Sequence, residues 1–252
     1  MGGLSMASAN PVLLVTGASR GIGAATAKMA AERGFNVAIN FLHNAKAANE
    51  VAAAIEASGQ RAITIRGNMA REEEVTHVVD TTVRELGALT HLVYNSGITG
   101  APGRLEAADP KVLREVFDLN VLGALFCLRA AIPRMSIKHG QAGGAVVLLS
   151  SAAATIGSPG EYVWYAASKA AIDGMTTGLA RELAADGIRV NAVAPGLIDT
   201  EIHPAGRLEK LTPLIPIGRV GAADEVAQTI LFLLSDAASY VTGSVLRVAG
   251  GR

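Results

Sequence analysis

The alternation of short apolar runs with longer Ala-rich stretches constrains the fold of this chain most. The runs predict strands at 11–16, 36–41, 61–66, 91–94, 145–150, 188–193 and 244–248. Several are apolar without interruption, which is typical of strands covered on both faces. The stretches between them predict helices at 21–33, 45–57, 71–86, 109–138, 160–185 and 222–235. This order predicts an α/β fold: a doubly wound, mostly parallel sheet of seven strands with helices on both faces.

The chain contains no fixed-period repeat, low-complexity tract or linker, so we expect one domain over residues 10–252. Residues 1–9 are interpreted as a leader or a disordered N-terminus. The least regular segment, 196–221, contains three prolines and four glycines. A loop of that length in a compact α/β domain is more often a functional lid than a connector.

Charge and cysteine content exclude several classes of function. The 22 Lys and Arg residues balance 22 Asp and Glu residues, so nothing favours binding to nucleic acid or to an anionic membrane. No apolar run reaches the length needed to span a bilayer. Cys127 is the only cysteine, which excludes an internal disulfide and fits a reducing cytoplasm. We expect a cytoplasmic protein, and we predict no metal site.

Gly17, Gly21 and Gly23 form a G-x-x-x-G-x-G pattern between the first strand and the first helix. Dinucleotide binding needs this context, because small residues let the backbone approach a pyrophosphate at the N-terminus of a helix. The alternative is a glycine-rich turn without a ligand.

The same turn also spells G-x-S-x-G around Ser19, the pattern of a hydrolase nucleophile. A nucleophile elbow needs an oxyanion-hole loop from an earlier strand, and only one predicted strand precedes Ser19. No triad partner is obvious among the five histidines, although His203 stays open. A serine hydrolase is therefore the less favoured hypothesis.

Tyr165 is the only tyrosine with a lysine four residues later, Lys169. On a helix the two side chains share a face. A free phenol has a pKa of about 10, and a nearby ammonium or an oxidised nicotinamide favours its ionised form. The pair therefore predicts a proton donor and acceptor. The alternative is a core tyrosine beside a surface lysine.

Three further polar residues are candidates for the same site. Ser150 and Ser151 end an apolar strand, at the edge where open parallel sheets bind ligands. Successive strand residues point to opposite faces, so we expect one of the two to face the site. Asn120 lies inside a helical pattern, where asparagine is a mediocre helix former, which suggests a polar task. Capping and solvent exposure are the alternatives.

With these motifs the chain resembles the short-chain dehydrogenase/reductase family over nearly its whole length. It is similar to the branch of about 250 residues that includes 3-oxoacyl-acyl-carrier-protein reductases and glucose dehydrogenases. The resemblance also rests on Asn95-Ser96-Gly97, on residues 191–200 and on residues 240–244. It implies a single-domain Rossmann-type fold and a dinucleotide cofactor.

The resemblance implies a role for each site residue. Tyr165 would exchange the proton, and Lys169 would lower its pKa and bind the nicotinamide ribose. Ser151 would hold the substrate oxygen, and Asn120 would anchor a water relay to Lys169. The remaining cofactor contacts would be Ser19, Ile22, Asn68, Met69, Asn95, Ser96, Gly97, Pro195, Gly196, Ile198 and Thr200.

This sequence departs from the family pattern at two points. The spacing of Ser151 and Tyr165 is one residue longer than we expect, which leaves Ser150 open as the substrate-binding serine. Asn68 stands where many members carry an Asp against the adenine, and its amide can still form a hydrogen bond there.

The end of the second predicted strand indicates which cofactor is preferred. An NAD site places an acid there to bind the ribose 2′-hydroxyl. Here no acid occurs between Glu32 and Glu50, and Asn40 is neutral. Arg20 in the glycine turn can pair with a 2′-phosphate. We therefore predict NADP(H) over NAD(H), the alternative being a solvated Arg20 and an Asn40 that caps the next helix.

These observations predict an NADP(H)-dependent oxidoreductase that interconverts a carbonyl and a secondary alcohol. The rival from another class is an inert dinucleotide-binding sensor or scaffold.

Substrate determinants are expected in 152–164 and 197–216, where Tyr162, Trp164, His203 and Leu214 either line a pocket or pack. The resemblance, together with apolar stretches at 121–132 and 166–180, predicts a homotetramer.

Overall fold

The computed structural model describes residues 10–203 and 206–252. The predicted leader, 1–9, lies outside the described residues. Seven strands form one sheet in the order β3-β2-β1-β4-β5-β6-β7, and every neighbouring pair is parallel. The strands are β1 (Val12–Val15), β2 (Asn36–Phe41), β3 (Ala62–Arg66), β4 (Leu89–Tyr94), β5 (Gly144–Leu149), β6 (Ile188–Pro195) and β7 (Val245–Val248). The predicted Rossmann-type fold is confirmed.

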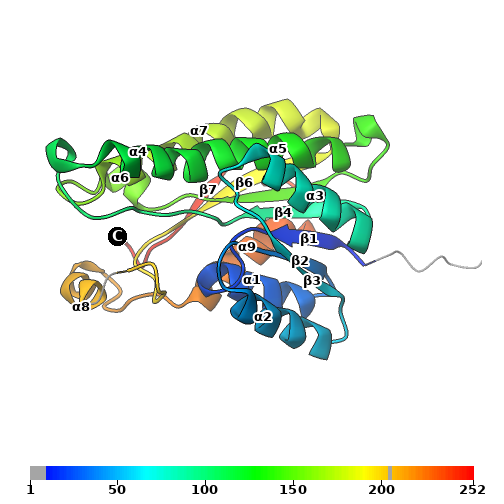
Figure 1. Ribbon diagram of the computed structural model, residues 1–252, viewed down its shortest axis with the longest axis horizontal. Helices are drawn as coiled ribbons and strands as arrows, with labels where there is room; N and C mark the ends of the chain where they lie inside the picture. The colour runs from blue at the N-terminus through cyan, green and yellow to red at the C-terminus, as the bar shows by residue number, and fades with distance from the viewer. Residues whose placement is uncertain (1–9, 204–205) are drawn as a thin grey trace, which may run out of the picture.

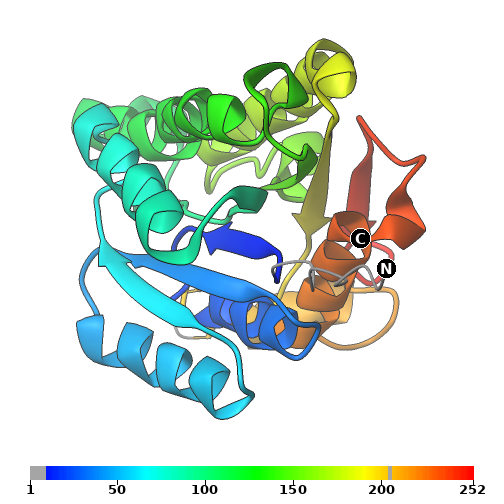
Figure 2. The same cartoon turned by 90° about the vertical axis from the view of Figure 1, so that its right-hand side faces the viewer.

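Helices cover both faces of the sheet (Figures 1 and 2). One face carries α1 (Gly21–Ala31), α2 (Ala45–Ala57) and α9 (Ala223–Leu234). The other carries α3 (Glu72–Leu86), α5 (Gly123–Ala131) and α7 (Val163–Leu183). The shorter helices are α4 (Pro110–Phe117), α6 (Ala153–Ile156) and α8 (Arg207–Leu211), and α8 lies beyond the carboxyl ends of the strands.

The uninterrupted apolar strands are explained by two hydrophobic cores. All four residues of β1 are buried. Leu14 contributes to the core under α3, α5 and α7, whereas Leu13 and Val15 contribute to the core under α1, α2 and α9. Because successive strand side chains point to opposite faces, a strand between two helical layers needs apolar residues at every position.

Two predicted helices differ in the structure. The predicted helix 109–138 begins as expected, with Asp109 accepting a hydrogen bond from the Lys111 amide at 2.8 Å and Pro110 in the first turn. It then passes through a π-helical turn, η2 (Asp118–Leu122), before α5. The predicted helix 160–185 begins only at Val163, because the chain turns at 158–162 with a positive φ at Ser158.

The helical stretch Pro110–Arg134 is long and apolar enough, by length and composition alone, to cross a membrane. Asp118 and Arg129 interrupt its apolar sequence. In the fold, 39% of its most apolar window is buried. Its buried residues, including Val116, Cys127 and Leu128, pack within the hydrophobic cores.

The crossover from β3 to β4 reverses the direction in which strands are added, because β1 lies between β2 and β4. In open α/β sheets, ligands bind at the carboxyl ends of the strands beside such a switch point. The segment after β6 borders this edge. It contains α8 and a 3-10 turn at Thr212–Leu214, so it is more regular than predicted.

Candidate active site

A cleft of about 830 Å³ opens at the carboxyl ends of the strands. It brings together most of the predicted site residues from seven separate segments. Those that line it are Gly17, Ser19, Arg20, Gly21, Ile22, Asn40, Asn68, Met69, Asn95, Ser96, Gly97, Ser151, Tyr165, Lys169, Pro195, Gly196, Ile198 and Thr200. Gly23 and Asn120 do not line the cleft.

The glycine turn follows β1 and is held by the segment after β4. Gly17 and Gly21 adopt φ values of 61° and 54°, which favour glycine. The amide of Asn95 donates to the carbonyls of Thr16 and Gly17, both at 3.0 Å. A Cβ at Gly23 would come within 2.6 Å of this amide, so Gly23 permits the close packing of α1 against the turn.

The N-terminus of α1 faces the cleft through Gly21 and Ile22. Among the described residues no side chain caps this helix, and its first turn contains no acid. The backbone N–H groups and the positive end of the helix dipole are therefore directed at the cleft. This is the arrangement that binds a phosphate group.

Asn40 performs a task that the sequence did not reveal. Its side chain is buried, accepts a hydrogen bond from the Gly17 amide at 3.2 Å, and donates to the carbonyls of Ile65 and Gly67 at 3.3 and 3.0 Å. The predicted alternative of a helix cap does not apply, because Asn44 caps α2. Asn40 therefore joins the glycine turn to the end of β3 through its side-chain hydrogen bonds.

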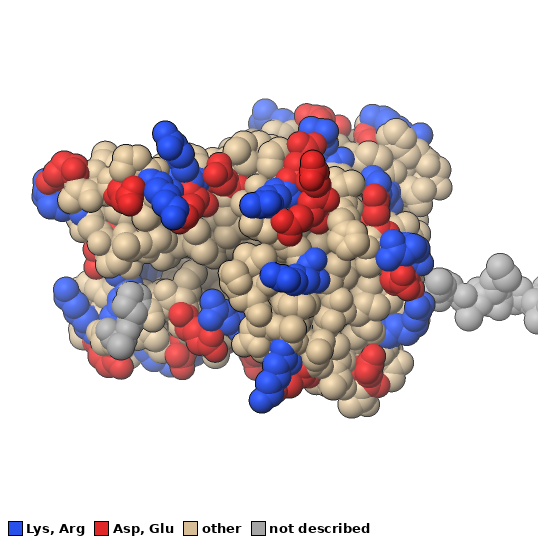
Figure 3. Space-filling view, viewed as in Figure 1, with Lys and Arg blue, Asp and Glu red and all other residues tan. Residues whose placement is uncertain are grey.

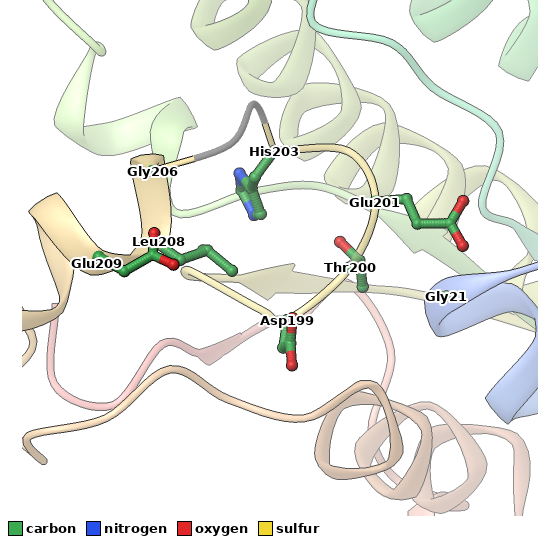
Figure 4. A pocket seen from close by; sticks show the side chains of 8 residues that line it. All are labelled: Gly21, Asp199, Thr200, Glu201, His203, Gly206, Leu208 and Glu209. Carbon is green, nitrogen blue, oxygen red and sulfur yellow. The ribbon is translucent and has the colours of Figure 1, made fainter.

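Arg20 pairs with an acid that sequence reasoning missed. Its Nη1 lies 2.7 Å from the Glu201 carboxylate, and both side chains are largely exposed. The ion pair joins the glycine turn to the segment after β6. A second hollow of about 450 Å³ lies beside it, and Figure 4 shows Glu201 extending toward the side on which Gly21 lies. Arg20 is thus a solvated turn residue, as the alternative interpretation has it, and it is also paired with an acid.

Asn68 lines the cleft, but its side chain also closes a local turn. The carboxamide oxygen accepts a hydrogen bond from the backbone N–H of Ala70 at 3.0 Å, and the backbone N–H of Asn68 donates to the Glu74 carboxylate at 2.8 Å. The side-chain N–H₂ group remains the part of Asn68 suited to an adenine contact.

Tyr165 and Lys169 lie on α7, one turn apart. The Lys169 Nζ is 5.8 Å from the centroid of the Tyr165 ring and donates to the Leu149 carbonyl at 2.5 Å. Ser151 lies beside the Tyr165 phenol, and its Oγ also accepts from the Ala153 amide at 3.1 Å. Ser150 is buried, also borders the cleft, and donates to the Lys169 carbonyl at 3.4 Å. Of the two serines, Ser151 faces the phenol.

Asn120 lies in the π-helical turn η2 and is fully buried. It accepts from the Ile98 amide and donates to the Ile98 carbonyl, each at 2.9 Å, and it donates to Ser168 at 3.0 Å. A Cβ at Gly97 would lie 3.2 Å from the Asn120 oxygen and 3.4 Å from the Lys169 Nζ. The two side chains therefore converge at Gly97.

Burial acts on the protons of this pair in opposite directions. It lowers the pKa of Lys169 to about 8, while Asp173 acts against the decrease. It raises the pKa of the Tyr165 phenol, and the Ser151 hydroxyl acts against the increase. Because desolvation disfavours both charged forms, ionising the phenol requires positive charge close to it.

The comparisons with known proteins agree with this geometry. A family model described as enoyl-(acyl carrier protein) reductase matches residues 17–252. A solved short-chain dehydrogenase from Burkholderia cenocepacia, in complex with NADP, superimposes with a TM-score of 0.90 at 37% identity, covering 96% of this chain and 97% of that one. The chain is a short-chain dehydrogenase/reductase.

Two relatives are similar to this short-chain dehydrogenase/reductase over nearly their whole length. An uncharacterized oxidoreductase, YgfF, of Escherichia coli is 46% identical over 96% of this chain and 99% of its own length. A 3-oxoacyl-[acyl-carrier-protein] reductase of Synechocystis is 40% identical over 95% of this chain and 96% of its own length. The predicted family is thus confirmed.

The far end of the cleft in this short-chain dehydrogenase/reductase lies between two loops. Tyr162 and His203 line it, which is the first of the two alternatives predicted for them. Trp164 does not line it; it packs instead, with its indole N–H donating to the Thr99 carbonyl at 2.8 Å. Leu214 also points elsewhere and is exposed, whereas Leu211 lines the cleft.

A second ion pair lies at this end of the cleft. The Arg207 Nη1 lies 2.6 Å from Glu161, and the guanidinium stacks 4.9 Å from the Tyr162 ring centroid. Nothing in the sequence pairs Arg207 with Glu161, because the two residues are 46 positions apart. Only the fold brings them together.

Proposed function

We propose that this protein is an NADP(H)-dependent oxidoreductase that interconverts a carbonyl and a secondary alcohol. One observation carries the proposal: Ser151, Tyr165 and Lys169 converge beside the glycine turn, and Asn120 supports them from behind. A core tyrosine beside a surface lysine does not describe the pair, since Lys169 is buried and both side chains line the cleft.

The proposed roles follow from these positions. Tyr165 gives a proton to the substrate oxygen in reduction and takes it back in oxidation. Ser151 holds that oxygen through a hydrogen bond. Lys169 in its ammonium form stabilises the phenolate. NADPH supplies the hydride when bound. The residues of the protein position the substrate and exchange the proton with its oxygen.

Asn120 acts as a support for Lys169 in this proposal. Its three hydrogen bonds to Ile98 and Ser168 fix the π-helical turn, and its oxygen lies beside Gly97, next to the ammonium. A water relay to Lys169 anchored by Asn120 fits this position. π-helical turns occur frequently at functional sites.

The cleft suits a dinucleotide with a 2′-phosphate. The uncapped N-terminus of α1 is available to the pyrophosphate, and no carboxylate stands among Phe41, Leu42, His43 and Asn44 at the end of β2. Arg20 would move from Glu201 to the 2′-phosphate, exchanging one ion pair for another. The NADP in the Burkholderia cenocepacia structure and the NADPH in a metagenomic blue fluorescent protein of 33% identity support this choice.

A spectrophotometric screen tests the proposed activity. Purified protein with NADPH and a panel of ketones, sugars, steroids and β-ketoacyl thioesters should show steady loss of NADPH absorbance with at least one carbonyl. The name of the Synechocystis relative places 3-oxoacyl thioesters first in the panel. NADPH binding without turnover across the panel would favour the sensor or scaffold. Ester cleavage without nucleotide would favour a hydrolase that uses Ser19.

We further propose that residues 10–252 work as a single domain in the cytoplasm and assemble as a homotetramer. Several apolar side chains stay exposed on the outer helices of the described chain: Phe117, Leu122 and Leu125 on the α4–α5 stretch and Phe232 on α9. A second copy would cover them. The acids and bases on the face seen in Figure 3 are intermingled, which gives no single-sign patch there for nucleic acid.

Light scattering at micromolar concentration should return about four times the chain mass of 25.8 kDa. Leu125→Asp should shift the mass downward, because a carboxylate at the centre of an apolar contact loses its hydration. Lys111→Asp, on the same helical stretch but already polar and exposed, is the matched control. A parent protein of monomeric mass contradicts the assembly.

A further inference from the structure

Asp173 is a half-buried acid to which the proposed chemistry assigns no task. It lies on α7 one turn beyond Lys169 and two turns beyond Tyr165, so the three side chains follow one face of the helix. Its Oδ1 is fully buried and is the only buried side-chain N or O atom of the described residues without a hydrogen-bond partner. An unpaired buried carboxylate oxygen is costly and calls for an explanation.

The charged groups around Asp173 come from two elements. Lys169 lies on α7 itself, and Arg247 faces the carboxylate from β7. The Ser150 hydroxyl approaches it from the end of β5, directly before Ser151. Burial raises the pKa of Asp173, and these three groups act against the increase. The carboxylate therefore lies near both the lysine and the strand end that carries the serine.

Lys169 needs such a partner. Its side chain is 4% exposed, and its hydrogen bond to the Leu149 carbonyl brings no negative charge. Among the groups that act on it, Asp173 is the one that opposes desolvation. An ammonium that must stay charged in a dry site requires a nearby anion, because burial favours the neutral amine.

We propose that Asp173 is a positioning residue that keeps Lys169 in its ammonium form during turnover. The inference rests on the proposed function, in which that ammonium stabilises the Tyr165 phenolate. Asp173 touches neither substrate nor cofactor in this scheme, and it acts through Lys169. Its unpaired oxygen is explained as the cost of holding a charge beside the catalytic lysine.

The sign of the effect follows from the pKa of Lys169. The ammonium form is present below about pH 8 and is lost as the pH rises through that value. Removing the Asp173 charge lowers the pKa of Lys169 further, since the group that opposes desolvation is gone. The alkaline decline of activity should therefore begin at a lower pH.

The test compares pH profiles of kcat/KM for NADPH-dependent reduction between pH 5.5 and 9.5. Asp173→Asn and Asp173→Ser both remove the charge but differ in shape. Each should move the alkaline limb down by about half a pH unit or more, and each should keep activity within about threefold of the parent at pH 6. Asp173→Glu, which retains a carboxylate, should keep the limb near the parent position.

Glu182→Gln is the matched control, because it removes a carboxylate from the exposed end of the same helix. Its limb should not move. An unmoved limb in the neutral Asp173 variants, or an equal loss of activity at every pH, overturns the proposal. Failure of both neutral variants to fold also overturns it, by assigning the carboxylate to stability. A fully active Tyr165→Phe variant instead removes the proposed function itself, whatever Asp173 does.

Discussion

Replacement of Tyr165 by phenylalanine should lower kcat by about a thousandfold or more, the usual weight of a lost acid–base group. That factor corresponds to about 4 kcal/mol of transition-state stabilisation. The ring remains, so its packing beside Val116, Tyr162 and Trp164 is kept, and only the proton donor is removed. NADPH binding, followed by fluorescence titration, should change little. Single-turnover rates with a reducible carbonyl provide the measurement.

Tyr162→Phe is the control for this experiment. Tyr162 lines the same cleft three residues earlier, but its hydroxyl has no proposed part in proton transfer. Removing the Tyr162 hydroxyl should lower kcat by less than about tenfold. A Tyr165→Phe variant that retains more than a tenth of parental activity would remove Tyr165 from the mechanism.

NADPH should be preferred over NADH by at least about tenfold in kcat/KM, which is 1.4 kcal/mol and modest for one charged contact. Arg20→Ala should remove most of this preference by weakening NADPH, and should leave NADH nearly unchanged, because only NADPH carries the 2′-phosphate. Steady-state kinetics with both cofactors measures the ratio. Arg33→Ala removes an exposed arginine from beyond the far end of α1 and should leave the ratio as it is.

The acid that should reverse the preference belongs at Leu42, not at Asn40. Asn40→Asp would place a carboxylate against the carbonyls of Ile65 and Gly67, so it would test the stability of the glycine turn. Leu42 follows β2 and lines the cleft, so Leu42→Asp introduces repulsion toward a 2′-phosphate. Equal kcat/KM for the two cofactors in the parent would contradict the assignment.

The sheet and its site edge could be predicted from the sequence because both depend on local patterns. Continuous apolar runs indicated strands buried on both faces, and the motifs lay at their carboxyl ends. The task of Asn40 could not be predicted in the same way. Whether its side chain faced the ribose or the turn depends on how β2 is oriented against β1 and β3, which no local pattern states.

Contacts between distant segments account for the other differences. Glu201 and Arg207 are ordinary charged residues in the sequence, and their partners, Arg20 and Glu161, are 181 and 46 positions away. The π-helical turn at Asn120 adds no distinctive residue to the helical pattern and becomes visible only in backbone hydrogen bonds such as that from the Gly123 amide to the Asp118 carbonyl. Charge pairing and backbone irregularity of this kind are set by the assembled fold.

The segment after β6 is fastened at two points, by Arg20–Glu201 to the glycine turn and by Glu161–Arg207 to the loop before α7. The first of these ion pairs lies largely in solvent and the second partly so, whereas Lys169 and Asn120 are buried. Dissolved salt screens exposed charges within about 10 Å at 0.1 M and reaches buried ones far less. Ionic strength therefore acts on the two ion pairs that hold this segment beside the cleft, while the buried groups next to the proton transfer are largely insulated from it.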